Sequence, residues 1–185
     1  AAGQLAFGIV TALLHRLVAR EAGDRAARVA VLLFAFDPLL VAFSHRLWSE
    51  TLFIALFLLA LDQLLLAVRE TGWGRLAVTG LVLGASALVR PMVVTSLPFI
   101  GLWLLWQAWR DRAEGGLRLA RPVLQTLVLG LCCLTVILPW TARNQRVSGT
   151  FILIDSNGPF NFLVGSQPEA RFVDKDDVWS SRYGR

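Results

Sequence analysis

Residues 44–69 read SHRLWSETLFIALFLLALDQLLLAVR, a short polar group followed by a long apolar run. Between Thr51 and Val68 the only charged side chain is that of Asp62. A helix over these residues would measure roughly 27 Å at about 1.5 Å per residue, close to the hydrocarbon thickness of a bilayer. Because a helix satisfies its own backbone groups in lipid, the stretch predicts a membrane-crossing helix with ionisable groups at its start.

The composition of the whole chain agrees with this reading. Of its 185 residues 56% are hydrophobic and 17% are charged, and the mean hydropathy is +0.60. A soluble domain usually has about 25% charged residues. The net charge of +5 raises the possibility of a nucleic-acid partner, but the cations are mostly arginines at the ends of apolar blocks. They do not form a stripe on one face, so the pattern favours a polytopic membrane protein and argues against nucleic acid.

We expect about six crossings in an all-α bundle. The run 76–109 would span roughly 51 Å as one helix, too long for a single crossing, and Arg90-Pro91 supplies a break within it. Asp37-Pro38 similarly predicts a stop near Phe36 in the second block. The expected crossings are 4–18, 26–43, 51–68, two short ones within 76–109, and 123–140. This topology places nine arginines on one side (20, 25, 28, 69, 75, 110, 112, 118 and 121) and four on the other (46, 90, 143 and 146), as the positive-inside rule requires.

The sequence divides into a transmembrane helical domain over 1–146 and the beginning of an extracytoplasmic domain over 147–185. Residues 150–154 and 160–164 are predicted as short strands around a turn, which makes this segment mixed α/β. Cys132 and Cys133 adjoin in an apolar run and are expected to be free thiols packed among helices. The spacing Gly80-x-x-x-Gly84 predicts a close helix contact. No initiator Met is present, so we expect a piece of a larger protein.

The topology brings distant ionisable and polar residues to one membrane face: His45, Arg46, Glu50, Arg90, Arg143 and Asn144. Arginine binds phosphate in a fork, and more strongly where water is scarce, so Arg90, Arg143, Arg46 and His45 are candidates for holding a lipid phosphate. A carboxylate at the same face can act as a base, which makes Glu50 and Asp37 the catalytic candidates. No metal-ligand spacing is present, and we expect no cofactor; a divalent cation stays open but is not indicated.

Some of these residues also have a simpler interpretation, although an interfacial arginine between two short apolar runs, such as Arg90, is harder to explain in this way. Arg46 and Arg143 fit headgroup anchors at helix ends, and Glu50 fits a helix N-terminus whose dipole favours a negative charge after the N-cap Ser49. Asp37 and Asp62 would be costly in lipid. Asp37 lies nearer the outer face, whereas Asp62 lies deeper and is expected to pair within the bundle.

A series of short motifs, in order along nearly the whole chain, resembles the C-type glycosyltransferases, which include protein O-mannosyltransferases and lipid A aminoarabinose transferases. The matching pieces are LLHRLVAR ending at Arg20, Asp37-Pro38, WSETLF from Trp48, GLVLGASALVRP ending at Pro91, PWTARN ending at Asn144, and SNG from Ser156 with the residues up to Pro168. Position 37 departs from the aromatic or small polar residue expected before the proline, which leaves the role of Asp37 open.

The resemblance implies inverting transfer of a sugar from a polyprenyl-phosphate donor to a lipid, glycan or protein acceptor. The protein would be a multi-pass enzyme of the bacterial inner (plasma) membrane with its active face outward. The family's general base would lie in a loop upstream of Ala1, which leaves Glu50 as the best acidic candidate here. Two alternatives stay open: a transporter or flippase-like carrier whose path is lined by Asp37, Asp62 and Arg90, and a non-catalytic membrane subunit. Repeated halves would favour the carrier, and we find no internal repeat.

Overall fold

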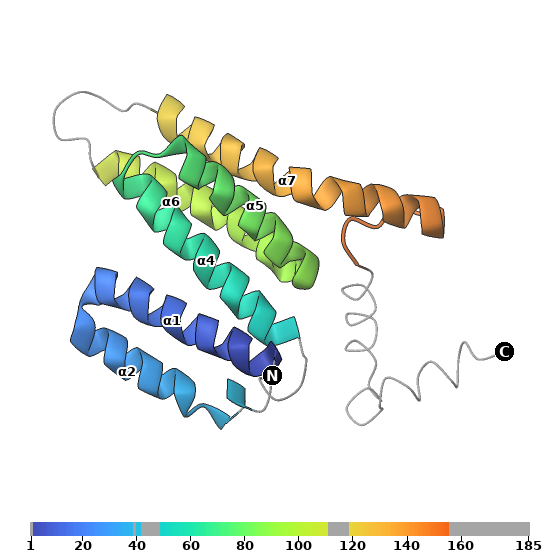
Figure 1. Cartoon of the computed structure of the whole chain (residues 1–185). Helices are drawn as coiled ribbons and strands as arrows, with labels where there is room; N and C mark the ends of the chain where they lie inside the picture. Colours follow the sequence, from blue (N-terminus) through green and yellow to red (C-terminus); the bar gives the residue numbers. More distant parts are fainter. Residues whose placement is uncertain (1, 39, 42–48, 111–118, 156–185) are drawn as a thin grey trace, which may run out of the picture.

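The computed structural model describes residues 2–38, 40–41, 49–110 and 119–155, and within these ranges all regular structure is helical. Figure 1 shows α4 lying between a hairpin of two helices on one side and a group of three helices on the other. The predicted all-α membrane bundle is confirmed. The elements are α1 (Ala2–Ala22), α2 (Asp24–Ala35), α4 (Ser49–Arg69), α5 (Trp73–Val89), the 3-10 helix η1 (Pro91–Thr95), α6 (Ser96–Arg110) and α7 (Ala120–Ser148).

Three helical stretches among the described residues are long and apolar enough to cross a membrane: Ser49–Arg69, Pro91–Arg110 and Ala120–Ser148. The helix Trp73–Val89 is apolar but shorter. Large apolar side chains face outward along these helices, as with Phe99, which is 70% exposed. An exposed apolar surface of this kind fits contact with lipid rather than water.

The α1–α2 hairpin turns at Gly23, whose φ of +87° is a conformation that glycine adopts without strain. The rings of Phe7 and Phe34 stack with centroids 4.8 Å apart and join the two helices. The last helical residue of α2 is Ala35, and Phe36 caps it. The predicted stop near Phe36 is therefore confirmed, because the residue before Pro38 is disfavoured in a helix. With 12 residues, α2 spans only about 18 Å and is too short to cross a bilayer alone.

The predicted break at Arg90-Pro91 is also confirmed. α5 ends at Val89, and Arg90 adopts an extended backbone with φ −141° and ψ 105°. Proline at 91 opens η1, which leads directly into α6. The run 76–109 thus forms two helices joined by η1 instead of one over-long helix, and both helices pack against α7.

The two glycines of the predicted close contact lie against α7. A Cβ on Gly80 would come within 2.5 Å of the carbonyl oxygen of Leu129, and one on Gly84 within 2.6 Å of that of Cys133. Both distances are shorter than any real Cβ contact, so only glycine permits this approach. The rising order on both helices shows that α5 and α7 run in the same direction. Both cysteines are free, and Cys133 is buried in this interface, as expected.

The sequence prediction was wrong about the residues after the last crossing, where we expected a strand over 150–154. The helix α7 extends past the expected end of the crossing near Trp140, through Pro139 to Ser148. Gly149, in a left-handed conformation, then reverses the chain. Residues 150–154 form an irregular segment, and Ile154, which is 7% exposed, joins the apolar core of the bundle. The other expected strand, 160–164, lies outside the described residues.

Candidate active site

An ion pair between α4 and the end of α5 is the centre of the candidate site. Glu50 lies in the first turn of α4, and Arg90 is held at the end of α5 by the extended conformation that precedes Pro91. An Nη2 hydrogen of Arg90 is donated to Oε1 of Glu50. The two side chains are 38% and 21% exposed. The structure therefore joins two residues that the sequence had placed only on the same membrane face.

The pair leaves chemistry available on both partners. A guanidinium carries five N–H donors in a plane, so Arg90 can hold a carboxylate on one edge and present the other edge to a phosphate. Glu50 keeps further acceptor positions while one oxygen is bound to Arg90. Because both side chains are partly open to solvent, a ligand at the membrane surface can reach them.

Arg143 lies at the same end of the bundle on α7. Its guanidinium stacks over the ring of Trp140 with 4.8 Å between the guanidinium carbon and the ring centroid. The parallel packing of α5 and α7 places Gly80 beside Leu129 and Gly84 beside Cys133. The same offset along the two helices brings Arg90 level with about position 139, and one helical turn is about 3.6 residues. Arg143 therefore lies about one turn beyond the level of Arg90.

The other predicted site residues differ in how far the structure describes them. Oδ1 of Asp37 accepts a hydrogen bond of 2.9 Å from the backbone N–H of Leu40, which caps the turn after α2. This segment lies at the same end of the bundle as the start of α4 (Figure 1). His45 and Arg46 fall outside the described residues. Among the described residues, no group of three or more His, Cys, Asp or Glu side chains is placed to hold a metal ion.

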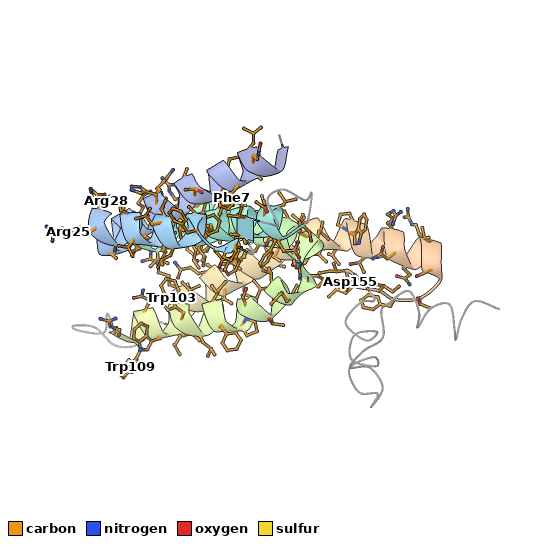
Figure 2. The ribbon with its side chains drawn as sticks, turned by 90° about the horizontal axis from the view of Figure 1, so that it is seen from below. Phe7, Arg25, Arg28, Trp103, Trp109 and Asp155 are labelled. Carbon is orange, nitrogen blue, oxygen red and sulfur yellow. The ribbon has the colours of Figure 1, made fainter. Side chains whose placement is uncertain are left out.

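Asp62 belongs to the opposite end, as expected from its depth. It is 1% exposed and pairs with Arg20 of α1, and Nη2 of Arg16 lies 3.5 Å from its second oxygen. Around it, Arg69 pairs with Glu21 at 2.8 Å and Arg75 with Glu70 at 2.8 Å. Figure 2 shows Arg25, Arg28 and Trp109 at this end of the molecule and Asp155 toward the other. The predicted pairing of Asp62 within the bundle is confirmed.

Sequence reasoning missed a set of hydrogen bonds that begins on the last turns of α7. Trp140 Nε1 donates to the carbonyl oxygen of Ile154 at 3.0 Å. Thr141 Oγ1 donates to that of Leu153 at 2.6 Å. Asn144 Nδ2 donates to those of Ile152 and Ile154 at 3.3 and 3.0 Å. The spacing 140, 141, 144 puts three donors on one helical face, which was the available signal.

The helices, the charged ends and the partly exposed Arg90–Glu50 pair together describe an integral membrane protein with a polar site at one end of its bundle. The family model for dolichyl-phosphate-mannose-protein mannosyltransferase matches residues 1–141 of the 185. The chain belongs to this family of membrane glycosyltransferases, which confirms the resemblance drawn from the motifs. Neither the curated proteins nor the solved structures contain a significant match to the chain.

Proposed function

We propose that the protein transfers a sugar from a polyprenyl-phosphate donor to a hydroxyl of a lipid, glycan or protein acceptor at the outer face of the membrane. The observation that supports this most directly is the partly buried Arg90–Glu50 pair at one end of the bundle. A lipid phosphate is confined to that depth by its own apolar tail, so a guanidinium placed there meets the phosphate without leaving the interface.

In the proposed reaction Arg90 binds the donor phosphate with the N–H groups that Glu50 leaves free. The acceptor oxygen attacks the anomeric carbon from the side opposite the phosphate, and the bond between that carbon and the phosphate oxygen breaks. The electron pair leaves with the phosphate, whose developing charge Arg90 stabilises. The proton of the acceptor hydroxyl passes to a carboxylate base.

Glu50 has two possible contributions in this scheme. It orients the Arg90 guanidinium in the resting protein, and with its remaining acceptor positions it can take the hydroxyl proton. Asp37, at the same end, is the second acidic candidate, and the family likeness implies a further base upstream of Ala1. Arg143, Arg46 and His45 are proposed as additional phosphate contacts.

The proposed orientation has the Arg90 end outward. The Asp62 end of the bundle carries most of the arginines of the described helices, among them Arg20, Arg25, Arg69, Arg75 and Arg110. Cytoplasmic ends of membrane helices are enriched in arginine and lysine. This supports an inner-membrane protein whose transfer site faces away from the cytoplasm.

The test is transfer of mannose from polyprenyl-phosphate mannose by the full-length protein in membranes. We expect Arg90→Ala to lower kcat/KM at least about tenfold, which corresponds to about 1.4 kcal/mol of lost transition-state stabilisation, with normal expression. Arg25→Ala is the matched control, because Arg25 is an exposed arginine at the opposite end of the bundle. Its turnover should equal that of the unmodified protein.

Glu50→Gln separates the two contributions of the carboxylate. If Glu50 only orients Arg90, the variant should lower kcat/KM by no more than Arg90→Ala does. If it takes the proton, kcat should fall strongly. Unchanged turnover in Arg90→Ala, at normal protein level, would remove Arg90 from the site and leave the transfer proposal without its main support.

A further inference from the structure

An apolar groove lies between α4 and α6. No Cα atom of α4 comes within 8 Å of one of α6, whereas helices that pack directly have axes only about 8–10 Å apart. The groove has a volume of about 290 Å³, and its walls are α4, α6 and Leu17 of α1. Figure 2 shows Trp103, one of the lining residues, on the side of α6 that faces the layer of α1 and α4. The two helices therefore face each other across a groove and are not in direct contact.

The lining of this groove is suited to a hydrocarbon chain. Its residues are apolar except for Ser96, and three of them are the aromatic Phe57, Phe99 and Trp103. The hydroxyl of Ser96 already donates to the carbonyl oxygen of Val93, at 2.6 Å. The side chains of the groove thus offer a ligand almost only apolar contacts, which a sugar or a phosphate could not use.

The groove opens toward the Arg90–Glu50 pair. Phe57 lies seven residues after Glu50, which is two turns and about 10 Å further along the same face of α4. On the other wall Ser96 is the first residue of α6, and only η1 separates it from Arg90. A phosphate bound to Arg90 would therefore have the groove directly below it on the membrane side.

A second ion pair marks the inner end of the groove. Leu65 and Leu17 line the groove, and Arg69 and Glu21 each follow one of them by four residues, one turn further on the same helical face. Nη2 of Arg69 lies 2.8 Å from Oε2 of Glu21. A hydrocarbon chain gains nothing from contact with these charges, so the apolar length of the groove ends there. From the level of Glu50 to that of Leu65, α4 rises about 22 Å.

We propose that this groove binds the isoprene units of the donor that are nearest the phosphate, and that the two ion pairs limit how many units it recognises. The inference rests on the proposed function, because a phosphate at Arg90 puts the first units at the outer end of the groove. The donor brings one chain on one phosphate, which matches one groove below one guanidinium, whereas a phospholipid carries two chains on glycerol. Units beyond Leu65 lie in the bilayer. Since lipid tails are as apolar as the groove, binding gains packing contacts and not the transfer of the chain out of water.

The length of the donor chain is the first test, in the full-length protein in detergent micelles. Donor concentrations are expressed as mole fractions of the micelle, so that partition from water does not enter. The KM for geranylgeranyl-phosphate mannose should be about fivefold lower than that for geranyl-phosphate mannose, because the longer chain fills the groove. Undecaprenyl-phosphate mannose should agree with the geranylgeranyl donor within about twofold, since its further units lie outside. Equal KM values for the geranyl and geranylgeranyl donors would overturn the groove, and a second fall of similar size for undecaprenyl would overturn the limit.

Leu61→Trp tests the groove by filling it midway. The variant should raise the KM for the geranylgeranyl donor about fivefold, to the value for the geranyl donor, whose own KM should not change. Leu65→Trp fills only the inner end and should give a smaller effect in the same direction. Leu102→Trp is the matched control, because this leucine of α6 is 61% exposed and does not line the groove. An equal rise of the KM for all donors in both groove variants would overturn the inference.

Binding is also measured without transfer, by alkylation of a cysteine at the edge of the groove. Phe99 lines the groove and is 70% exposed, so the thiol introduced by Phe99→Cys should react with N-ethylmaleimide. The reaction of the unmodified protein gives the background from Cys132 and Cys133. Geranylgeranyl phosphate should slow alkylation, and inorganic phosphate and dioleoyl phosphatidic acid should not. Equal protection by phosphatidic acid would show a groove for any lipid chain and would overturn the assignment to the donor.

The outcomes separate this inference from the proposed function. Protection by geranylgeranyl phosphate in Phe99→Cys, in a protein whose transfer is indifferent to Arg90→Ala, would support the groove and contradict the proposed site for the phosphate. If Arg90 is required for transfer but geranylgeranyl phosphate gives no protection, the groove inference is overturned and the proposed function stands.

Discussion

The two ends of α4 carry the same kind of interaction in different surroundings. At one end Asp62 is 1% exposed and pairs with Arg20, with Arg16 nearby. At the other, Glu50 and Arg90 are 21% and 38% exposed. Two arginines around a buried carboxylate leave it no room for a ligand, whereas a partly exposed pair keeps unused donors and acceptors. A structural ion pair thus differs from a candidate site in its burial and in the number of charged partners around it, and not in charge alone.

The largest effect should come from the buried end. Asp62→Ala removes the buried partner of Arg20, whose side chain is 20% exposed, and leaves only Glu21, with Oε1 3.6 Å from the Nε of Arg20, to balance that cation. Breaking a buried pair in this way costs about 3 kcal/mol or more. We expect a loss of that size in the free energy of unfolding, measured by titration with sodium dodecyl sulfate in mixed micelles.

The double variant Asp62→Leu with Arg20→Met is the control for this prediction. It replaces both charges with apolar side chains of similar size, and such replacements are often neutral or stabilising. Stability should return to within about 1 kcal/mol of the unmodified protein, and transfer should be normal. If instead the double variant folds but has lost transfer, the Asp62 end takes part in function and the contrast between the two ends is wrong.

The elements that the sequence predicted well depend on local rules. Proline after Asp37 and after Arg90 ended two helices where expected, since the steric conflict lies within two neighbouring residues. The glycine pair at 80 and 84 packed closely because small residues a turn apart form one flat helical face. The pairing of Asp62 within the bundle followed from the cost of an unpaired charge in an apolar surrounding.

The elements that the sequence missed depend on contacts between distant residues. Pro139 lies inside α7, and the helix continues beyond the apolar run from which we had predicted the crossing 123–140. Residues 150–154 have a strand-like sequence, but the donors at Trp140, Thr141 and Asn144 compete successfully for their carbonyls. For the candidate site, the topology predicted that Glu50 and Arg90 share a face. That the two side chains form a pair could not be predicted, because hydropathy indicates the depth of a residue in the membrane and not which helices are neighbours.

An intermediate effect on stability and transfer should come from the contact between α5 and α7, because α5 positions Arg90. Gly84→Ala would place a Cβ 2.6 Å from the carbonyl oxygen of Cys133 and so push α5 from α7. Overpacking of this kind costs about 1–3 kcal/mol, partly offset by the higher helix propensity of alanine. We expect a net loss of about 1 kcal/mol in stability and a several-fold loss of transfer, because α5 carries Arg90. The Asp62–Arg20 pair, which joins α1 and α4, should be undisturbed.

Gly130→Ala on α7 is the matched control for that variant. A Cβ there meets no atom within 4 Å, so alanine should be neutral or stabilise the helix by up to about 1 kcal/mol. Equal effects of the two substitutions would mean that the α5–α7 contact does not hold Arg90 in place, and the site end would then be less dependent on packing than the comparison assumes.

The smallest effect should come from a second ion pair between the same two helices that Asp62 and Arg20 join. Nη2 of Arg69 lies 2.8 Å from Oε2 of Glu21, but the two side chains are 50% and 34% exposed. Water and salt screen such a pair, so Glu21→Gln should cost less than about 1 kcal/mol, and high salt should remove the difference. Both variants break an ion pair between α1 and α4, and the two pairs differ in burial; Glu21→Gln also weakens the contact of Glu21 with the Nε of Arg20, at 3.6 Å. If Glu21→Gln lowers the free energy of unfolding as much as Asp62→Ala does, burial does not distinguish the ion pairs along α4. Partial exposure would then give no reason to regard Arg90 and Glu50 as available to a ligand.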